Sequence, residues 1–286
     1  MAPPHAIDTK NPAAVAQAVT QCFAGMGAPG SGPLLERLIS GVTRLFAGEH
    51  AGLLPIDMFY HNYEHTLQAT VCAVHMLVGR HRAQTAPVLS ARDGELTVMA
   101  ALMHDTGFLK RTDDRQGTGA KYTFVHERRS ADLARSFLPP FGVAPAELDD
   151  IATAIGCTGP ANRISGATFR RPEARLIACV LVTADYLSQM SAPDYVDKLP
   201  VLYREFVEAY DFEELPADKR LFHSFRDLME RSPAFWEKFV RPMLDTEMGG
   251  LYRFLETTGQ ANPYLQAIED NVSEVRRRVQ AGLVNV

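Results

Sequence analysis

The sequence predicts an almost wholly α-helical protein. Its apolar residues recur mostly at intervals of three and four positions, which is the spacing of one face of a helix. Alternating runs of β-branched residues, the usual signal of a strand, are nearly absent. Prolines and glycines divide the periodic stretches into segments of helical length. We therefore expect an all-α bundle.

The helices expected in the N-terminal half start at recognisable capping residues. Asn11 precedes Pro12, and a capping residue followed by proline is a typical helix start. Asn62 is likewise a good N-cap for a helix with an apolar stripe. The expected order is a helix from 12 that stops by 25–27, a linker at 27–33, a helix at 34–47, a turn at 52–55, a helix at 62–79 and a helix that ends at 104–105.

The C-terminal half begins with a polar, glycine-containing stretch at 110–122, which we expect to be a surface loop. Residues 176–184 are apolar on every side, so the helix that contains them is expected in the centre of the bundle. The expected helices are 126–137, 145–155 and 172–190, followed by amphipathic helices separated at Pro216, Pro233, Pro242, Gly249-Gly250 and Asn262-Pro263.

Size, composition and charge narrow the class of protein. A chain of 286 residues buries a substantial interior without cross-links, and its four cysteines are scattered, so we expect free thiols. A net charge of −5 lacks the basic footprint of a nucleic-acid binder. No leader pattern and no apolar run of about 18 residues is present, which predicts a cytoplasmic protein without a membrane segment. We expect N-terminal helices at 1–55, a metal-binding core at 56–192 and packed C-terminal helices at 193–286.

Two short segments carry side chains that bind metals. His61 and His65 are four residues apart, so they share one face if the helix begins before His61. If Asn62 is instead the N-cap, His65 lies in the first turn of the helix and His61 lies just outside it. His104-Asp105 closes a helix just before Thr106-Gly107, where both side chains can converge on one ion. Imidazole with carboxylate suits Mn, Fe, Zn or Ni and, less well, Mg. The alternative is a pair of partly exposed histidines at a helix start.

Asp185 is the third candidate because it follows a nearly uncharged run. An ionised carboxylate on so apolar a helix is strongly disfavoured unless a cation or hydrogen-bond donors meet it. A metal ion supplies that compensation. The alternative is a salt bridge to an arginine such as Arg163 or Arg175.

The ordered set His65, His104-Asp105 and Asp185 resembles the H…HD…D signature of the HD-domain metal-dependent phosphohydrolases, over roughly 59–190. In addition, the segment from Tyr60 through His61 and Asn62 to His65 is similar to the Y-H-N-x-x-H segment of class I cyclic-nucleotide phosphodiesterases. The resemblance implies an all-α HD-domain helical bundle, one or two divalent ions, and hydrolysis of phosphoester bonds.

The resemblance also implies roles for individual residues. His65, His104, Asp105 and Asp185 would bind the first ion, with Asp105 able to bridge to a second, and His61 would protonate the leaving oxygen. Near Cys157, where several two-metal subfamilies carry another histidine, this chain has none, so the resemblance implies one ion and leaves the second open.

A further group of residues is expected to hold a second metal or to contact phosphate. His126 falls where many HD proteins place an additional histidine, and its surroundings offer cationic side chains as anion contacts. The residues of this group are His126, Lys121 and Arg129.

The leading interpretation is a metal-dependent phosphohydrolase, a phosphodiesterase that cleaves a nucleotide or related small phosphoester through a metal-bound hydroxide. Two alternatives stay open: an HD-fold di-iron oxygenase, and a non-catalytic, metal-stabilised ligand-sensing protein. The expected partner is a small phosphoester, with neither nucleic acid nor membrane. The helices outside the match either cover the pocket or form a homodimer.

Overall fold

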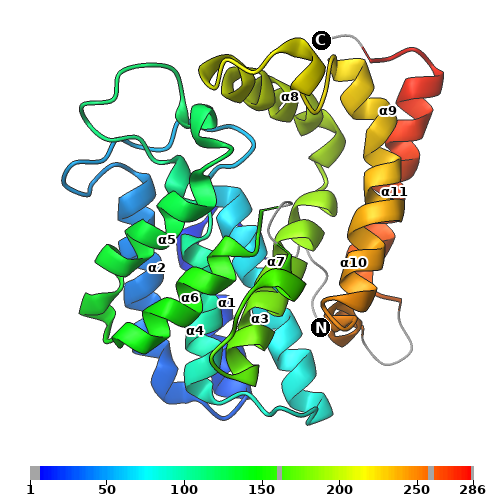
Figure 1. Cartoon of the computed structure of the whole chain (residues 1–286). Helices are drawn as coiled ribbons and strands as arrows, with labels where there is room; N and C mark the ends of the chain where they lie inside the picture. The colour runs from blue at the N-terminus through cyan, green and yellow to red at the C-terminus, as the bar shows by residue number, and fades with distance from the viewer. Residues whose placement is uncertain (1–6, 160–162, 257–260, 285–286) are drawn as a thin grey trace.

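A computed structural model describes residues 7–159, 163–256 and 261–284, and over these residues the expectation of an all-α fold is confirmed (Figure 1). The described segments contain helices and no strand, with one isolated bridge between Leu53 and Arg111. The α-helices are α1 Pro12–Gly25, α2 Gly32–Phe46, α3 Tyr63–Ala83, α4 Ala91–Met103, α5 His126–Phe137, α6 Pro145–Gly156, α7 Pro172–Met190, α8 Tyr195–Phe212, α9 Phe225–Phe235, α10 Arg241–Thr246 and α11 Pro263–Gln280.

Short helical segments join these helices. The connections contain the 3-10 turns η1 Pro29–Ser31, η2 Thr106–Phe108, η3 Gly119–Tyr122, η4 Pro139–Phe141, η5 Ile164–Gly166, η6 Ala217–Lys219 and η8 Leu251–Leu255, and the π-helical turn η7 Trp236–Val240. The expected starts at Asn11-Pro12 and Asn62 are confirmed, because each asparagine side chain accepts hydrogen bonds from the first turn of its helix.

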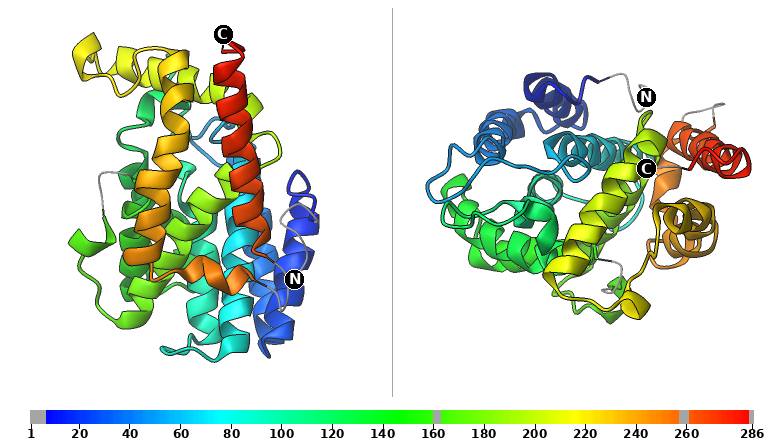
Figure 2. Two further views of the ribbon diagram at one scale, coloured as in Figure 1. Left: turned by 90° about the vertical axis from the view of Figure 1, so that its right-hand side faces the viewer. Right: turned by 90° about the horizontal axis from the view of Figure 1, so that it is seen from above.

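Helix α7 occupies the centre of the molecule, as its apolar sequence predicts. It packs against α3, α4 and α6 on one side and against α11 on the other. In Figure 1, α7 lies between the N-terminal helices and the pair formed by α9 and α11, and the view from above in Figure 2 shows α8 crossing between the same two groups. Every residue from Ile177 to Ser188 is buried. One continuous apolar core contains side chains from all three expected segments, including Val15, Leu181 and Val275.

Three boundaries differ from the expectation. The linker at 27–33 is shorter, because η1 and the first two residues of α2 lie within it. Helix α3 does not stop at Gly79 but continues to Ala83. A Cβ at Gly79 would lie 1.8 Å from the carbonyl oxygen of Phe254, so this glycine permits a close approach and is not a helix stop. Pro233 lies inside α9, and the wider π turn follows it.

The stretch at 110–122 is not wholly a surface loop. Lys110, Ala120 and Lys121 are buried. Their burial is possible because the Lys110 ammonium lies 2.7 Å from a carboxylate oxygen of Asp57 and the Lys121 ammonium pairs with Asp114. Part of this polar segment therefore packs into the interior of the protein, where its two lysines form ion pairs.

Within the described ranges no single helix is both long enough and apolar enough to span a membrane. Helices α7 and α8 reach that length and apolarity only when they are taken together, and this pair is bent by 110°.

The central place of α7 generates a prediction for stability. Leu181→Ala removes a fully buried side chain and should lower the free energy of unfolding by about 2–5 kcal/mol. Urea denaturation of the full chain measures this change. Leu283→Ala is the matched control, because Leu283 is 60% exposed and should change the stability by less than about 0.5 kcal/mol. Equal effects of the two substitutions would contradict the central position of α7.

Candidate metal centre

The first turn of α3 directs His65 into the core. The Asn62 side chain accepts a hydrogen bond from the backbone N–H of His65 at 3.1 Å, which fixes the start of the helix. The His65 residue is only 4% exposed, whereas His61 lies just before the helix, as expected. The alternative of two partly exposed histidines is therefore wrong for His65.

The end of α4 presents the second histidine. His104 caps the helix, and its Nδ1 lies 2.8 Å from the carbonyl oxygen of Ala101. Because a carbonyl only accepts hydrogen bonds, Nδ1 carries the proton and donates it. Nε2 is thus the nitrogen that faces the centre and can bind a metal ion, the usual arrangement for a metal-binding histidine.

Asp185 extends from the central helix α7 toward His65 and His104. Its carboxylate Oδ1 accepts a hydrogen bond from Gln189 Nε2 at 3.2 Å. Gln189 is held in turn by Tyr60, whose hydroxyl donates to Gln189 Oε1 at 3.1 Å. The alternative of a salt bridge to an arginine is wrong, because Arg163 pairs with the Glu247 carboxylate and Arg175 donates to the Glu247 carbonyl.

Four side chains from three helix segments meet at this centre. His65 Nε2 lies 3.1 Å from Asp185 Oδ1 and 3.3 Å from Asp105 Oδ2, and His104 Nε2 lies 3.3 Å from Asp105 Oδ2 and 3.6 Å from Asp185 Oδ1. Ligands that are each about 2.1 Å from one ion lie roughly 3.0–3.4 Å apart in octahedral or tetrahedral geometry.

Within the described residues, three polar atoms at the centre have no hydrogen-bond partner of suitable geometry. These buried atoms are Nε2 of His65, Nε2 of His104 and Oδ2 of Asp105. Buried polar atoms are normally satisfied, so a cluster of such atoms facing one another is typical of a ligand set. The buried group His65, His104 and Asp185 can hold a metal ion, and Asp105 faces both of its histidines.

Protons take the place of a cation in the metal-free centre. Burial opposes the charged form of His65, but the carboxylates of Asp105 and Asp185 outweigh burial and raise the pKa of His65 to about 9. The same balance raises the pKa of His104 well above its usual range. Burial also opposes ionisation of the two carboxyls, yet the charge and contacts of the histidines hold the pKa of each below its ordinary value.

His61 lies beside the centre and is oriented by a residue distant in sequence. Its Nδ1 lies 2.8 Å from Glu205 Oε2, and the other oxygen of Glu205 accepts hydrogen bonds from the backbone N–H groups of Phe59 and Tyr60. The ring centroids of His61 and His65 are 6.0 Å apart. The carboxylate beside His61 is thus that of Glu205 and not that of Glu64, which lies 3.7 Å from Lys198 Nζ.

His126 approaches the centre from the start of α5. Its Nδ1 donates to the carbonyl oxygen of Thr123 at 2.8 Å, and its Nε2 lies 3.7 Å from Asp105 Oδ1. The buried ring of Phe108 stacks between His126 and His61, with centroid distances of 4.3 and 5.0 Å. This stack fixes the separation of the two histidines.

The turn that follows Asp105 is held by close contacts with α5. A Cβ at Gly107 would lie 2.0 Å from the carbonyl oxygen of His126, so only glycine fits there. The Gly107 N–H donates to Ser130 Oγ at 2.8 Å. Arg129 donates to the carbonyl oxygens of Gly107 and Leu109 at 2.7 and 2.8 Å. These bonds fix the position of Asp105.

The cationic side chains expected at the site have other partners. The Lys121 ammonium pairs with Asp114 and donates to the Gln116 carbonyl, and Arg129 holds the turn after Asp105. Within the described ranges, neither Lys121 nor Arg129 forms a hydrogen bond or an ion pair with His65, His104, Asp105 or Asp185. The structure thus brings His126 to the centre but not these two cations.

Three supporting residues were not predicted from the sequence. Gln189 follows Asp185 by four positions on α7, so helical spacing is a signal that points to it. Phe108 follows the His104-Asp105 pair closely, but an apolar residue there is unremarkable in sequence. Glu205 is 144 positions from His61, and only the fold brings them together.

Comparison with known proteins found no matching family model and no matching curated protein. The interpretation of the site therefore depends on its own residues and geometry.

The unsatisfied ligand atoms generate a prediction for metal content. The purified chain should retain a divalent ion, and chelation should lower its melting temperature, because a ligand that binds only the folded state stabilises it. Asp185→Asn removes a ligand charge and should lower metal content at least tenfold. Asp132→Asn, which alters an exposed carboxylate, is the matched control. Equal metal content in both variants by elemental analysis would exclude Asp185 from the site.

The raised histidine pKa generates a prediction for pH dependence. Without metal, the folded state binds a proton at His65 more tightly than the unfolded chain does. The resulting stability is complete below a pH of about 6.5 and disappears as the pH rises through about 9. Metal-free protein should therefore melt at progressively lower temperature over this window. Metal-loaded protein should not show this decline, since the ion binds neutral imidazoles and His65 carries no extra proton to lose. Parallel declines in the two forms would contradict this assignment.

Proposed function

We propose that this protein is a metal-dependent phosphohydrolase of the HD type, a phosphodiesterase that acts on a nucleotide or a related small phosphoester. The observation that carries the proposal is the placement of His61. It is held by Glu205 and lies beside a buried cluster of two histidines and two aspartates. A metal site with an adjacent, oriented histidine suits hydrolysis, in which one part of the site activates water and another protonates the leaving group.

The ion would be held by His65, His104, Asp105 and Asp185. When bound, a divalent ion supplies Lewis acidity, which lowers the pKa of water and stabilises charge on a phosphoryl oxygen. The ligands need little reorganisation, because their donor atoms already face one another. Their orientation is fixed by contacts behind them, through Ala101 for His104 and through Gln189 for Asp185.

His61 would act as the general acid. Its Nδ1 is held by the Glu205 carboxylate, so Nε2 is the nitrogen that delivers a proton to the leaving oxygen. Glu205 also accepts hydrogen bonds from the chain on the N-terminal side of His61, which fixes the backbone and the ring together. The ring of Phe108 stacks on the His61 imidazole.

A second ion would lie between Asp105 and His126. The two oxygens of Asp105 point in different directions, Oδ2 toward His65 and His104 and Oδ1 toward His126. A carboxylate of this kind can bridge two ions. The segment around the buried Cys157 contains no histidine that could act as a further ligand. The second ion would therefore have fewer protein ligands than the first.

Hydrolysis ranks above the two alternatives. An HD-fold di-iron oxygenase normally uses a fuller set of six ligands, whereas the candidates here are His65, His104, Asp105, Asp185 and His126. A ligand-sensing protein without catalysis would have no use for an oriented acid beside its metal. The Glu205–His61 pair therefore favours an enzyme.

The role of His61 generates a prediction that depends on the leaving group. A nitrophenolate leaves without protonation, whereas an alkoxide needs a proton. His61→Gln should lower kcat by about 10²–10⁴-fold for an alkyl phosphodiester, and by a much smaller factor for bis(p-nitrophenyl) phosphate. Metal content should be unchanged. Assays with Mn, Fe, Ni, Mg and Zn measure the two substrates in parallel.

The matched control is His223→Gln, which alters an exposed histidine on the C-terminal side of the chain and should leave both rates unchanged. Equal losses for both leaving groups would show that His61 is not the acid. Iron content with consumption of oxygen, and no turnover of either phosphodiester, would favour the oxygenase instead.

A further inference from the structure

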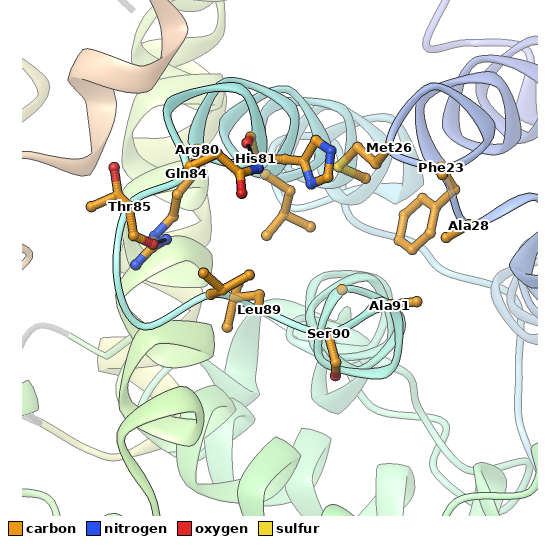
Figure 3. A pocket seen from close by; sticks show the side chains of 14 residues that line it. Phe23, Met26, Ala28, Arg80, His81, Gln84, Thr85, Leu89, Ser90 and Ala91 are labelled. Carbon is orange, nitrogen blue, oxygen red and sulfur yellow. Dashed lines mark hydrogen bonds between the residues drawn. The ribbon is translucent and has the colours of Figure 1, made fainter.

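A second candidate site lies at the far end of the helices that carry the metal ligands. A cavity of about 280 Å³, open to solvent on one side, is lined by the chain after α1, the last turns of α3, the loop at 84–90 and the first turn of α4 (Figure 3). His65 is in the first turn of α3 and His81 in the last, which places them about 24 Å apart along the helix axis. The cavity is therefore separate from the metal centre.

The wall of the cavity contains a buried cation that has few partners. Arg80 is 6% exposed, and its Nη1 donates to the carbonyl oxygen of Thr85 at 2.6 Å. The buried Nε has no hydrogen-bond acceptor in the part of the chain that the structure describes. Among the described residues no carboxylate forms an ion pair with this guanidinium, and burial lowers its pKa. A buried guanidinium without a counter-charge is costly, so the site favours an anion.

The end of the cavity opposite Arg80 is apolar, and His81, Gln84 and Ser90 also line the cavity. In Figure 3, Arg80 and Thr85 lie at one end, Phe23 and Ala28 lie at the other, and Leu89 lies between them. Small ligands are typically bound in this way, with a few polar groups that fix orientation and an apolar surface that accepts the body of the molecule. One cation at one end and apolar side chains at the other match a ligand with one charge and an apolar tail.

We propose that this cavity binds a small organic monocarboxylate, with its carboxylate on Arg80 and its apolar body against Phe23. A guanidinium presents donors that match a carboxylate. A single arginine neutralises one negative charge and not the two of a phosphate monoester. The site is independent of the phosphohydrolase proposal, because none of its lining residues belongs to the metal centre.

The competing explanation is that Arg80 is purely structural. It holds the loop at Thr85, and its guanidinium lies 5.9 Å from the ring centroid of Phe254. Such a role needs no ligand. It predicts that added carboxylates have no effect on the protein that depends on Arg80.

Octanoate is a suitable probe, with octan-1-ol and acetate as controls. Octan-1-ol has the tail without the charge, and acetate has the charge without the tail. Octanoate should raise the melting temperature of the full chain in a concentration-dependent way, and titration calorimetry should give an affinity at least tenfold tighter than for either control. Equal binding of all three compounds, or of none, would overturn the proposal.

Two variants locate the bound octanoate. Arg80→Met keeps a side chain of similar length without the charge and should weaken binding at least tenfold, whereas Arg82→Met, at an exposed arginine on the same helix, should leave it unchanged. Ala91→Phe fills the cavity from its wall and should abolish binding while Arg80 remains in place. Undiminished binding by folded Ala91→Phe would overturn the proposal even if Arg80→Met does not fold.

The metal centre is a second place where a carboxylate could bind. Asp185→Asn should therefore be titrated with octanoate as well, and should bind it as the parent chain does. Loss of octanoate binding in Asp185→Asn, with binding retained in Ala91→Phe, would place the carboxylate at the metal centre and overturn the proposal. Because these readouts do not use turnover, they remain informative if the protein hydrolyses no phosphoester.

Discussion

The burial of two aspartates within the helical core is the constraint on which the site depends. Asp105 and Asp185 are 3% and 8% exposed, and charges so placed require a cation or donors. The two histidines that face them can carry protons or hold a metal ion, and either arrangement offsets the carboxylate charge. This explains why the start of α3, the end of α4 and the middle of the bundle meet at one point.

The other elements position this cluster and extend it. The turn after Asp105 is fixed against α5 by Gly107, and the same helix brings His126 to the far oxygen of Asp105. Helix α8, which follows the helices that carry the metal ligands, supplies Glu205 to His61. The C-terminal helices therefore contribute a residue beside the site as well as covering the core, and a chain truncated after α7 would lack the partner of His61.

Sequence predicted well what depends on local pattern. The capping residue Asn62, the helix end at His104 and the apolar α7 are all visible in sequence, and these features place His65, His104, Asp105 and Asp185. Contacts between distant residues could not be predicted this way. Glu205 was missed because nothing near His61 points to it, and Lys121 was misplaced because its partner Asp114 lies in a loop that folds inward. Gly79 resembles a helix stop in the sequence, but a glycine is needed there because a side chain would collide with the backbone of Phe254.

X-ray absorption spectroscopy of the metal-loaded protein tests the central claim most directly. The account predicts a first shell of nitrogen and oxygen atoms at roughly 2.0–2.2 Å, with outer-shell scattering from two imidazole rings on the first ion. His104→Ala should remove part of the imidazole signal. A sulfur ligand from one of the four cysteines, or a shell without imidazole, would contradict the assignment of this cluster as the metal centre.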